Sequence, residues 1–253
     1  MDNSKFIAII PSRYASTRFP GKPLAMLAGK TVIQRVYEQV SKALSNVIVA
    51  TDDDRIFQHV NGFGGKAVMT GTHHRSGTDR CWEAYMLNGG NEDIIINVQG
   101  DEPFIQPEQI FALQHCFDDP STDIATLIKK FDSQGSYEEL ASPNSAKVVV
   151  NKQWHAIYFS RSVIPFLRGV PKEEWPSKHQ YYTHLGMYAY RAYALSQIVA
   201  MPQSSLEIAE SLEQLRWIEN GIKVKVGLSE MSSIGIDTPE DLARAEEFIK
   251  QQQ

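Results

Sequence analysis

A chain of 253 residues is long enough for one substantial α/β domain. Its composition, with 42% apolar and 22% charged residues, is ordinary for a soluble globular protein. The net charge of −5, without a long run of either sign, argues against a protein whose main partner is nucleic acid or an anionic membrane.

The two cysteines, Cys81 and Cys116, form no CxxC pair. Neither a zinc site nor a thioredoxin-like redox motif is therefore indicated. The N-terminal segment lacks the charged region and long apolar stretch of a secretory signal. No segment approaches the ~20 apolar residues that cross a bilayer. We expect a cytoplasmic protein without membrane insertion.

The first half of the chain alternates short apolar runs with amphipathic segments. KFIAII (5–10) is a continuous apolar run ended by Pro11, which is typical of a buried parallel strand. After Thr31, a candidate helix cap, apolar residues recur at helical spacing through Leu44. In chain order the prediction is a strand at 5–10, a helix at 32–44, a strand at 47–50, a short helix after 51–54, a strand at 67–69, a helix at 76–87, a strand at 94–98 and a helix at 107–117.

The short connections between these elements imply right-handed βαβ units, and therefore a parallel sheet with helices on both faces. In such sheets the ligand lies beyond the carboxyl ends of the strands. We therefore expect three loops to converge there, namely those that follow Ile10, Ala50 and Val98.

The remainder of the chain is less regular up to about residue 180 and regular again after it. The residues 165–180 are predicted to form a surface loop, because they mix prolines and glycine with charges. Further predictions are strands at 147–150 and 156–159 with a turn at Asn151, one helix at 205–219 stopped by Asn220-Gly221, a strand at 222–226 and a helix that starts at Thr238.

The loop after the first predicted strand has the sequence PSRYASTRFPGKP (11–23) and carries Arg13, Arg18 and Lys22. A triphosphate needs such a lining, because guanidinium groups contact phosphate oxygens in pairs and small residues let the backbone approach closely. A Walker A motif is absent. A solvated arginine-rich turn is the alternative, but the position after the first strand of a parallel sheet favours phosphate binding.

Two acids stand in similar places. Asp101 follows an apolar strand in NVQGDEP (97–103), and Asp237 precedes a helix in IGIDTP (234–239). Magnesium prefers carboxylates together with substrate phosphates and water. The two acids are therefore candidate magnesium ligands, while spacing alone also allows each to be a turn or cap acid.

Several polar residues permit both a structural and a functional interpretation. Ser76 and Asp79 form an S-x-x-D capping box, which also suits base and ribose contacts. Arg161 suits a carboxylate or a structural salt bridge, and His184 suits a sugar hydroxyl or a satisfied place in the core. On the helix predicted at 205–219, Glu207, Glu210 and Gln214 share a face that is either solvated or lines a sugar pocket.

Nine blocks, in this order, resemble the 3-deoxy-manno-octulosonate (Kdo) cytidylyltransferase family, the CMP-Kdo synthetases: PSRYASTRFPGKPL, VATDDDRI, HRSGTDR, NVQGDEPFI, KVVVN, IYFSRSVIP, HLGMYAYR, ESLEQLR and GIDTPEDL. The resemblance extends from about Phe6 to Phe248. It implies a Rossmann-like nucleotide-diphospho-sugar transferase fold, with a mostly parallel central sheet flanked by helices and a small dimerisation hairpin or loop. It also implies a single nucleotidyltransferase domain over residues 1–253, in which about 131–190 include the sugar-side and dimerisation element.

The resemblance implies an activity as well. Such a homodimeric enzyme transfers CMP from CTP to the 2-keto-3-deoxy sugar acid Kdo and releases pyrophosphate. It uses Mg²⁺, forms no covalent intermediate and serves bacterial lipopolysaccharide or capsule synthesis.

Carried over position by position, the resemblance implies three sets of site residues. Catalytic roles fall to Arg13, Lys22, Asp101 and Asp237, the two aspartates being the magnesium ligands. Nucleotide contacts fall to Ser12, Arg13, Lys22, Ser76, Gly77, Thr78 and Gln99. Sugar contacts fall to Gln99, Arg161, His184, Tyr188, Glu210 and Gln214.

Two positions depart from the family pattern. Ser12 stands where the family usually has Ala, and Thr183 stands where it commonly has Arg or Lys. An 8-amino form of the sugar, or another 2-keto-3-deoxy acid, therefore stays open.

Two other functions are alternatives. The first is a metal-dependent glycosyltransferase that uses Asp52-Asp53-Asp54 as its metal motif, and the triphosphate-sized basic loop argues against it. The second is a nucleotide-binding regulator without catalysis. The presence of both Asp101 and Asp237 beside Lys22 argues against that one.

Overall fold

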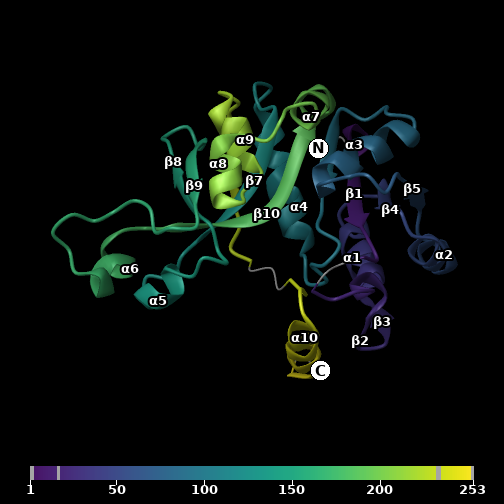
Figure 1. The fold of residues 1–253 in the computed structure, drawn as a ribbon, viewed down its shortest axis with the longest axis horizontal. Helices are drawn as coiled ribbons and strands as arrows, with labels where there is room; N and C mark the ends of the chain where they lie inside the picture. The colour runs from purple at the N-terminus through teal and green to yellow at the C-terminus, as the bar shows by residue number, and fades with distance from the viewer. Residues whose placement is uncertain (1–2, 16–17, 232–234, 252–253) are drawn as a thin grey trace. The chain divides into compact units, whose positions relative to one another are not determined.

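The computed structural model describes residues 3–15, 18–231 and 235–251. Ser16 and Thr17 of the basic loop, and Ile234 of the IGIDTP motif, are outside the described residues. The chain forms two compact units (Figure 1): unit 1 comprises Met1–Phe111, Ala189–Val199 and Ser233–Gln253, and unit 2 comprises Ala112–Tyr188 and Ala200–Ser232. Within the described ranges, no helix is long and apolar enough to cross a membrane. That both units together act as one nucleotidyltransferase domain stays a prediction.

Unit 1 alternates strands and helices. Its elements in chain order are β1 (Phe6–Ser12), β2 (Met26–Leu27), β3 (Lys30–Thr31), α1 (Val32–Ser41), β4 (Val47–Thr51), α2 (Asp54–Gly62), β5 (Ala67–Met69), α3 (Gly77–Leu87), β6 (Ile94–Asn97), the first residues of α4 (Pro107–His115), the last residues of β10 (Tyr182–Arg191), α7 (Ala192–Val199) and α10 (Pro239–Gln251).

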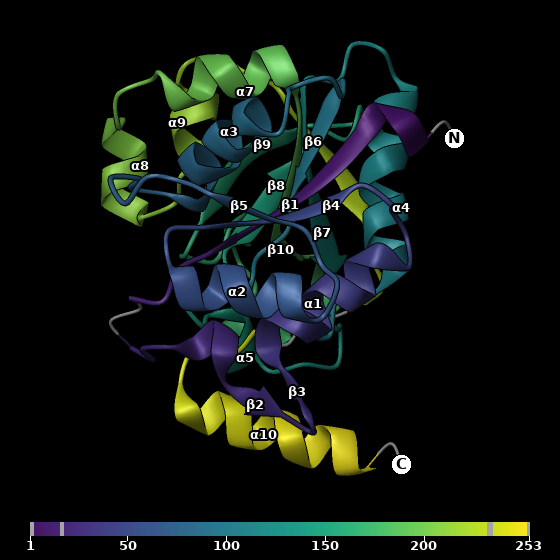
Figure 2. The ribbon, with the colours of Figure 1, turned by 90° about the vertical axis from the view of Figure 1, so that its right-hand side faces the viewer.

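Four parallel strands of unit 1 lie in the order β6-β1-β4-β5. The chain moves outward from β1 to β5 and then crosses back to β6. Right-handed connections consequently place α1 and α2 on one face of the strands and α3 on the other, as Figure 2 shows. The predicted parallel sheet with helices on both faces is confirmed.

Local sequence explains these elements. Ile7, Ile9 and Ile10 of β1 have no exposed surface, because a strand covered on both faces buries successive side chains. Thr31 caps α1 by accepting a hydrogen bond from the backbone N–H of Gln34. The predicted capping box of α3 is present in full.

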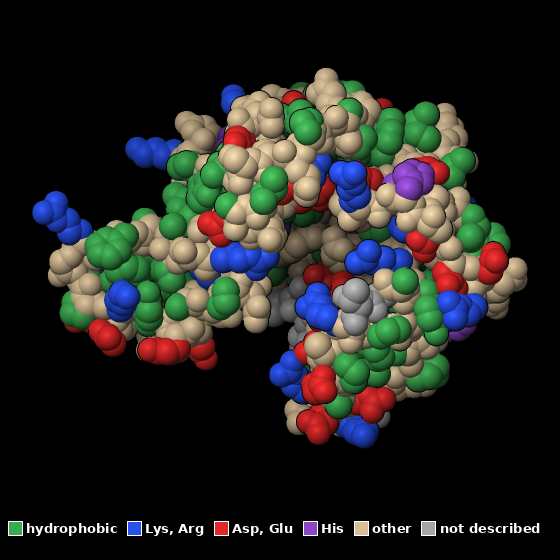
Figure 3. All heavy atoms as spheres, viewed as in Figure 1, with side chains coloured by type: hydrophobic (Ala, Val, Ile, Leu, Met, Phe, Trp, Pro, Cys, Tyr) green, Lys and Arg blue, Asp and Glu red, His purple; other side chains and the backbone are tan. Residues whose placement is uncertain are grey.

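The C-terminal helix α10 closes a small core of unit 1. Its Ala245 and the preceding Ile236 are fully buried with Leu27 of β2 and Val32 of α1, and Figure 2 shows α10 beside β2 and β3. Charged side chains cover the opposite, outer surface of α10 (Figure 3). The apolar face of α10 therefore holds the segment before it, which contains Asp237, against the β2–β3 hairpin.

Unit 2 is built from mixed strands. Its elements are the last residues of α4, β7 (Ile124–Lys130), α5 (Tyr137–Leu140), β8 (Lys147–Val150), β9 (Ala156–Ser160), α6 (Trp175–Lys178), most of β10, α8 (Ser205–Glu210), α9 (Gln214–Glu219) and β11 (Val224–Leu228). β11 and β7 are parallel, β10 lies next to both β7 and β8, and β8 is antiparallel to β9 and β10.

The core of unit 2 joins its strands to α9. Ile128, Val148, Phe159, Leu215 and Val226 bring together β7, β8, β9, α9 and β11. A second cluster lies in the segment predicted as a surface loop: Trp175 of α6 is 2% exposed and packs with Leu140 and Tyr181. The loop prediction over 165–180 is wrong at this point, because the indole buries more apolar surface than the flanking prolines and charges suggest.

The prediction of one continuous helix over 205–219 is also wrong. α8 ends at Glu210, Ser211 takes a left-handed conformation with φ of +51°, and α9 begins at Gln214. The break lets Glu207 of α8 and Arg216 of α9 form a buried ion pair. Periodicity in the sequence does not reveal such a corner, because apolar spacing is nearly preserved across it.

Candidate active site

A cleft in unit 1, with a volume of about 230 Å³, lies at the carboxyl ends of β1 and β6. Its lining comes from the loop after β1, the start of α3, the loop after β6 and the segment before α10. Two of the three loops predicted to converge, those after Ile10 and Val98, line it. The lining residues are Pro11, Ser12, Arg13, Arg18, Lys22, Pro23, His74, Arg75, Ser76, Gly77, Arg80, Gln99, Gly100, Asp101 and Asp237.

Glycine at two positions lets these segments approach each other. A Cβ atom on Gly100 would lie 2.8 Å from the carbonyl oxygen of Pro11, a contact that real side chains do not make. A Cβ atom on Gly77 would lie 3.2 Å from the Pro11 ring. The absence of a side chain at Gly100 thus permits the loop after β6, which carries Asp101, to lie against the end of β1.

Lys22 lies between two aspartates. Gly21, at φ of +74°, turns the chain so that Lys22 begins a short 3₁₀ turn. The Nζ atom of Lys22 donates to Asp101 Oδ2 at 2.6 Å and to Asp237 Oδ1 at 3.1 Å. Arg18 Nη1 lies 3.2 Å from the other oxygen of Asp237. The basic loop and the two acids therefore form one cluster.

Backbone contacts bring the two aspartates together. The N–H of Ile236 donates to the carbonyl oxygen of Asp101 at 2.8 Å. One residue later, the N–H of Asp237 donates to the Asp241 carboxylate, which also accepts from Thr238 at the start of α10. The cap of α10 and the segment after β6 consequently fix both carboxylates around one point, as the resemblance implies.

This cluster fits a divalent cation. Both carboxylates already contact one positively charged atom, Lys22 Nζ, so their oxygens converge on a site that favours positive charge. In the described ranges, no group of three or more His, Cys, Asp or Glu side chains could hold a metal. Two carboxylates, completed by phosphate oxygens and water, are a donor set that Mg²⁺ commonly uses.

The cleft is otherwise basic. Its lining includes Arg13, Arg18, Lys22, Arg75 and Arg80, against two aspartates. Clefts lined by charge of one sign concentrate ligands of the other sign, so this lining favours a highly charged anion such as a triphosphate. Figure 3 shows basic (blue) and acidic (red) side chains close together near the middle of the face in view.

The Asp52-Asp53-Asp54 motif is structural in its first two residues. Asp52 Oδ2 accepts from Arg80 Nη2 at 2.7 Å, and Arg80 also donates to Thr70 at 2.6 Å. Asp53 caps α2 by accepting from the N–H of Arg55 at 2.9 Å. Two carboxylates of the metal motif in the glycosyltransferase alternative are therefore already engaged: Asp52 with a buried arginine and Asp53 with the start of a helix.

Of the residues assigned to the nucleotide, the five that carry no charge differ in whether they line the cleft. Ser12, at the end of β1, is 5% exposed, and its hydroxyl has no hydrogen-bond partner within the described chain. Ser76, Gly77 and Gln99 line the cleft. Thr78 is buried at 3% exposure in the first turn of α3 and is not part of the lining as described.

Arg75 and His74 are among the lining residues that were not assigned from the sequence. Arg75 adds a cation beside Ser76. His74 is held through Nε2 by the carboxylate of Glu83, which also accepts from the N–H of Gly71 at 2.8 Å. The signal available for them was their position directly before the capping box of α3, at an edge where helix N-termini bind anions.

Apart from Gln99 of unit 1, the residues assigned to the sugar lie in unit 2. Arg161 Nε, Nη1 and Nη2 donate to the carbonyl oxygens of Glu210 at 2.6 Å, Pro143 at 2.7 Å and Ser211 at 3.1 Å. The Glu210 carboxylate accepts from Ser160 Oγ at 2.6 Å and from the Arg161 N–H at 2.9 Å. Of the five guanidinium N–H groups, two remain for a ligand after these three bonds.

Lys147 contacts the same turn, at 142–145, that Arg161 contacts through Pro143. It is fully buried on β8, and its Nζ donates to the carbonyl oxygens of Ser142 at 2.9 Å and Ser145 at 2.7 Å. Burial lowers the pKa of this ammonium group. Lys147 and Arg161 thus hold the turn at 142–145 from two sides, a role that sequence reasoning missed because a lysine in a strand is usually exposed.

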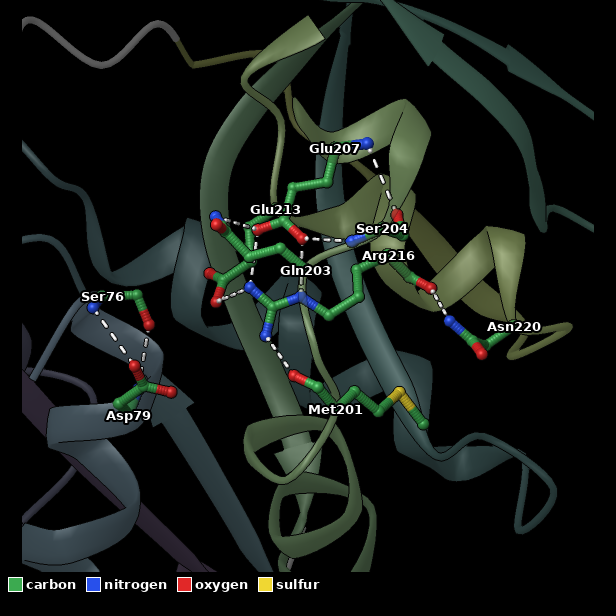
Figure 4. A network of polar contacts seen from close by, with 9 residues as sticks. All are labelled: Ser76, Asp79, Met201, Gln203, Ser204, Glu207, Glu213, Arg216 and Asn220. Atoms are coloured by element: carbon green, nitrogen blue, oxygen red, sulfur yellow. Dashed lines mark hydrogen bonds and ion pairs between the residues drawn. The ribbon is translucent and has the colours of Figure 1, made fainter. Parts of the chain in front are cut away.

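A buried ion pair fixes the corner between α8 and α9 (Figure 4). Arg216 donates to both carboxylate oxygens of Glu207, at 2.6 and 2.7 Å, and to the carbonyl oxygen of Met201 at 3.3 Å. Burial alone would raise the pKa of Glu207, but hydrogen bonds, above all from Arg216, lower it below its usual value. The predicted shared face of Glu207, Glu210 and Gln214 is therefore wrong: Glu207 is 5% exposed, and Glu210 points to Ser160.

The remaining sugar-side residues are enclosed. Gln214 is 3% exposed, and its Nε2 has no partner within the described chain. The rings of His184 and Tyr188 have centroids 5.3 Å apart, and Tyr188 packs edge-on against Trp217. Burial raises the pKa of the Tyr188 phenol well above its usual value. These groups present neutral donors and acceptors rather than free charge.

Taken together, a parallel sheet with helices on both faces, a basic cleft at its carboxyl edge and two convergent aspartates define a nucleotidyltransferase. The cytidylyltransferase family model matches residues 7–225 of the chain. Curated 3-deoxy-manno-octulosonate cytidylyltransferases from Bacteroides thetaiotaomicron and Phocaeicola vulgatus are each 62% identical to it, over 97% and 98% of this chain and 98% and 99% of theirs.

A solved structure agrees with these relatives. The chain resembles a CMP:2-keto-3-deoxy-manno-octonic acid synthetase in complex with CTP, at a TM-score of 0.90 and 42% identity, over 99% of this chain and all of the other. The chain belongs to the cytidylyltransferase family and, within it, to the 3-deoxy-manno-octulosonate cytidylyltransferases.

Proposed function

We propose that the chain transfers CMP from CTP to 3-deoxy-manno-octulosonate, giving CMP-Kdo and pyrophosphate. The observation that carries this proposal is the meeting of Asp101 and Asp237 at Lys22 Nζ, at 2.6 and 3.1 Å, inside a basic cleft. The names of the relatives, and of the CTP complex that the chain resembles, supply the nucleotide and the sugar acid.

The nucleotide is proposed to lie in the cleft of unit 1. Arg13 and Lys22 contact the triphosphate, and Arg75 adds charge beside them. The N–H of Gly77 lies in the first turn of the 11-residue helix α3, where peptide dipoles favour a negative group. Ser12 and Ser76 supply hydroxyls to the nucleotide, and Gln99 is proposed to contact both substrates.

Asp101 and Asp237 are proposed to hold Mg²⁺. When bound there, the ion supplies Lewis-acid polarisation of a phosphate oxygen. Lys22 contacts both carboxylates, and we expect its ammonium group to move toward the phosphates when nucleotide binds. Lys22 would then stabilise negative charge on the phosphates.

The reaction itself needs no protein nucleophile. The anomeric oxygen of the sugar forms a bond to the α-phosphorus of CTP and its proton passes to solvent, while the bond from that phosphorus to the bridging oxygen of pyrophosphate breaks. Such in-line displacement depends on positioning and charge neutralisation. Arg161, His184, Tyr188, Glu210 and Gln214 are proposed to position the sugar acid, with the two remaining guanidinium N–H groups of Arg161 facing its carboxylate.

The test is pyrophosphate release from CTP and Mg²⁺ with three sugar acids offered in parallel: Kdo, its 8-amino analogue and sialic acid. We expect turnover with Kdo and little with sialic acid. Faster turnover with the 8-amino sugar would reassign the substrate, in line with Thr183. No turnover with any acid, while CTP still binds, would contradict the proposed function and favour the regulator alternative.

We further propose that the protein works in the cytoplasm as a homodimer for lipopolysaccharide or capsule synthesis. Light scattering at micromolar concentration tests the dimer. Fractionation of cells tests the location, and loss of lipopolysaccharide or capsule on depletion distinguishes the two pathways.

A further inference from the structure

Thr126 of β7 lies beside two groups of β10, His184 and Met187. Its Oγ1 is 2.8 Å from Nε2 of His184 and 2.7 Å from the carbonyl oxygen of Met187. A third contact, to the carbonyl oxygen of Leu185, is longer at 3.4 Å. Thr126 has no exposed surface, so solvent does not compete for these bonds.

Counting protons assigns the direction of each bond. A threonine hydroxyl has one proton, and a carbonyl oxygen can only accept. If Thr126 gave its proton to His184, two oxygen atoms would face each other at 2.7 Å with no proton between them. The hydroxyl therefore donates to Met187, and the Nε2–H of His184 donates to Thr126.

This assignment fixes the other nitrogen of the ring. Neutral imidazole has one N–H, so Nδ1 of His184 carries a lone pair. Burial lowers the pKa of His184 to about 3, which keeps the ring neutral near pH 7. The rings of Phe159 and Tyr188, with centroids 5.1 and 5.3 Å away, pack against the imidazole and restrict its rotation.

The lone pair on Nδ1 has no hydrogen-bond donor in the described chain. This atom is not among the buried polar atoms that lack a partner in the described chain. The residue as a whole is partly exposed. The ring thus leaves its acceptor nitrogen without a donor in the described chain, while its donor nitrogen is held inside unit 2.

We propose that Thr126 is a positioning residue for sugar recognition: it holds His184 in the Nε2–H tautomer, so that Nδ1 accepts a hydrogen bond from a hydroxyl of the sugar. The inference rests on the proposed sugar-side role of His184 and adds a direction to it. A hydroxyl donates to this nitrogen, whereas a carboxylate oxygen cannot. His184 therefore selects a hydroxyl-bearing part of the sugar and leaves the carboxylate to other groups.

The first measurement needs no ligand. Nitrogen-15 NMR of the full chain labelled at histidine distinguishes a protonated ring nitrogen from one with a lone pair, and His184→Gln assigns the signal. We expect His184 to show a protonated Nε2 and a bare Nδ1 at pH 7.5. A protonated Nδ1 in the unaltered protein would overturn the proposal.

Two variants test the role of the hydroxyl. Thr126→Val keeps the shape of the side chain but removes both hydrogen bonds, and Thr126→Ser keeps them. In Thr126→Val we expect a mixture of tautomers. We also expect a KM for Kdo raised about 10-fold, which is the effect of losing one hydrogen bond. We expect the KM for CTP and kcat to change less than about 2-fold. Thr126→Ser should match the unaltered protein in every readout.

The outcomes separate this inference from the sugar-side assignment. If Thr126→Val shifts the tautomer but neither it nor His184→Gln changes the KM for Kdo, the sugar-side assignment of His184 fails. If His184→Gln raises that KM but Thr126→Val leaves both tautomer and KM unchanged, the positioning role of Thr126 is overturned. Equal losses for Thr126→Ser and Thr126→Val would also overturn it, because the hydroxyl would then not be the cause.

Discussion

In unit 1, Lys22 contacts two aspartates whose side chains are 31% and 45% exposed, whereas in unit 2 Arg216 contacts Glu207 with both side chains below 10% exposed. Exposed ion pairs contribute little to stability, so their partners can be exchanged at small cost. A buried pair cannot be broken without leaving a charge unsolvated. The comparison therefore indicates that the charged side chains in the cleft of unit 1 can change partners when a ligand binds. The buried ion pair of unit 2, in contrast, keeps a fixed arrangement.

The largest expected effect comes from breaking the buried pair. Arg216→Met should lower the free energy of unfolding by about 3–5 kcal/mol, because Glu207 would remain buried without its partner. Urea unfolding followed by circular dichroism measures it. The double variant Glu207→Gln/Arg216→Met should recover part of the loss, since it removes both charges. An Arg216→Met protein as stable as the original would remove the contrast between the two units.

In the cleft of unit 1 we expect a substitution to lower activity rather than stability. Asp101→Asn should lower kcat by ~10²-fold or more at saturating Mg²⁺, by analogy with other single electrostatic stabilisers, while stability changes little. Asp54→Asn, an exposed acid on α2, is the matched control and should keep full activity. A near-normal kcat for Asp101→Asn, measured by pyrophosphate release, would remove Asp101 from the metal site.

The neutral histidine of unit 2 gives a pH dependence. Burial lowers the pKa of His184 from 6.5 to about 3 in the folded chain, so below pH 6.5 the unfolded chain binds a proton that the folded chain does not. Its contribution to stability is complete above pH 6.5 and is lost as the pH falls toward 3. Between pH 7.5 and 5 the loss is about 2 kcal/mol.

The difference in unfolding free energy between the original protein and His184→Gln isolates this term, because other groups, Tyr188 included, titrate alike in both. The advantage of the original protein should shrink by that amount at pH 5. A difference that does not change with pH would mean that His184 is solvated, and that the fixed arrangement ascribed to unit 2 does not extend to it.

The smallest expected effect concerns the corner between α8 and α9. Ser211 has φ of +51°, a conformation that costs a residue with a side chain about 1–2 kcal/mol. Ser211→Gly should therefore raise the unfolding free energy by roughly 0.5–1 kcal/mol after its own entropic cost. Ser211→Ala, which keeps the strain, should show no gain. Thermal unfolding of both variants measures the difference.

Much of unit 1 could be predicted from the sequence. The strand at 67–69 is found at its predicted bounds, and the caps at Thr31, Ser76 and Thr238 are all present. Asp101 and Asp237 converge, as the resemblance implies, while the contact of both with Lys22 was not predicted. Strand periodicity and helix capping depend on residues that are close in sequence, so short segments are enough to predict them. The edge of the sheet where ligands bind follows from the order of the strands.

Unit 2 was less predictable. The broken helix at Ser211, the buried Trp175 and the buried Lys147 each contradict the tendency of their residue type or spacing. In each case contacts with residues distant in sequence outweigh local preference. The strands β7 and β10, which carry Thr126 and His184, were not predicted at all, although both are largely apolar.

The sequence by itself determined the parallel sheet of unit 1, the basic loop after β1 and the family, because short-range patterns and ordered motifs encode them. Only the tertiary structure decided that Lys22 lies between two carboxylates, although it is 215 positions from Asp237, and that His184 presents a bare nitrogen. Both depend on which polar atoms meet when distant segments pack, and the proton count at Thr126 exists only once β7 and β10 lie side by side.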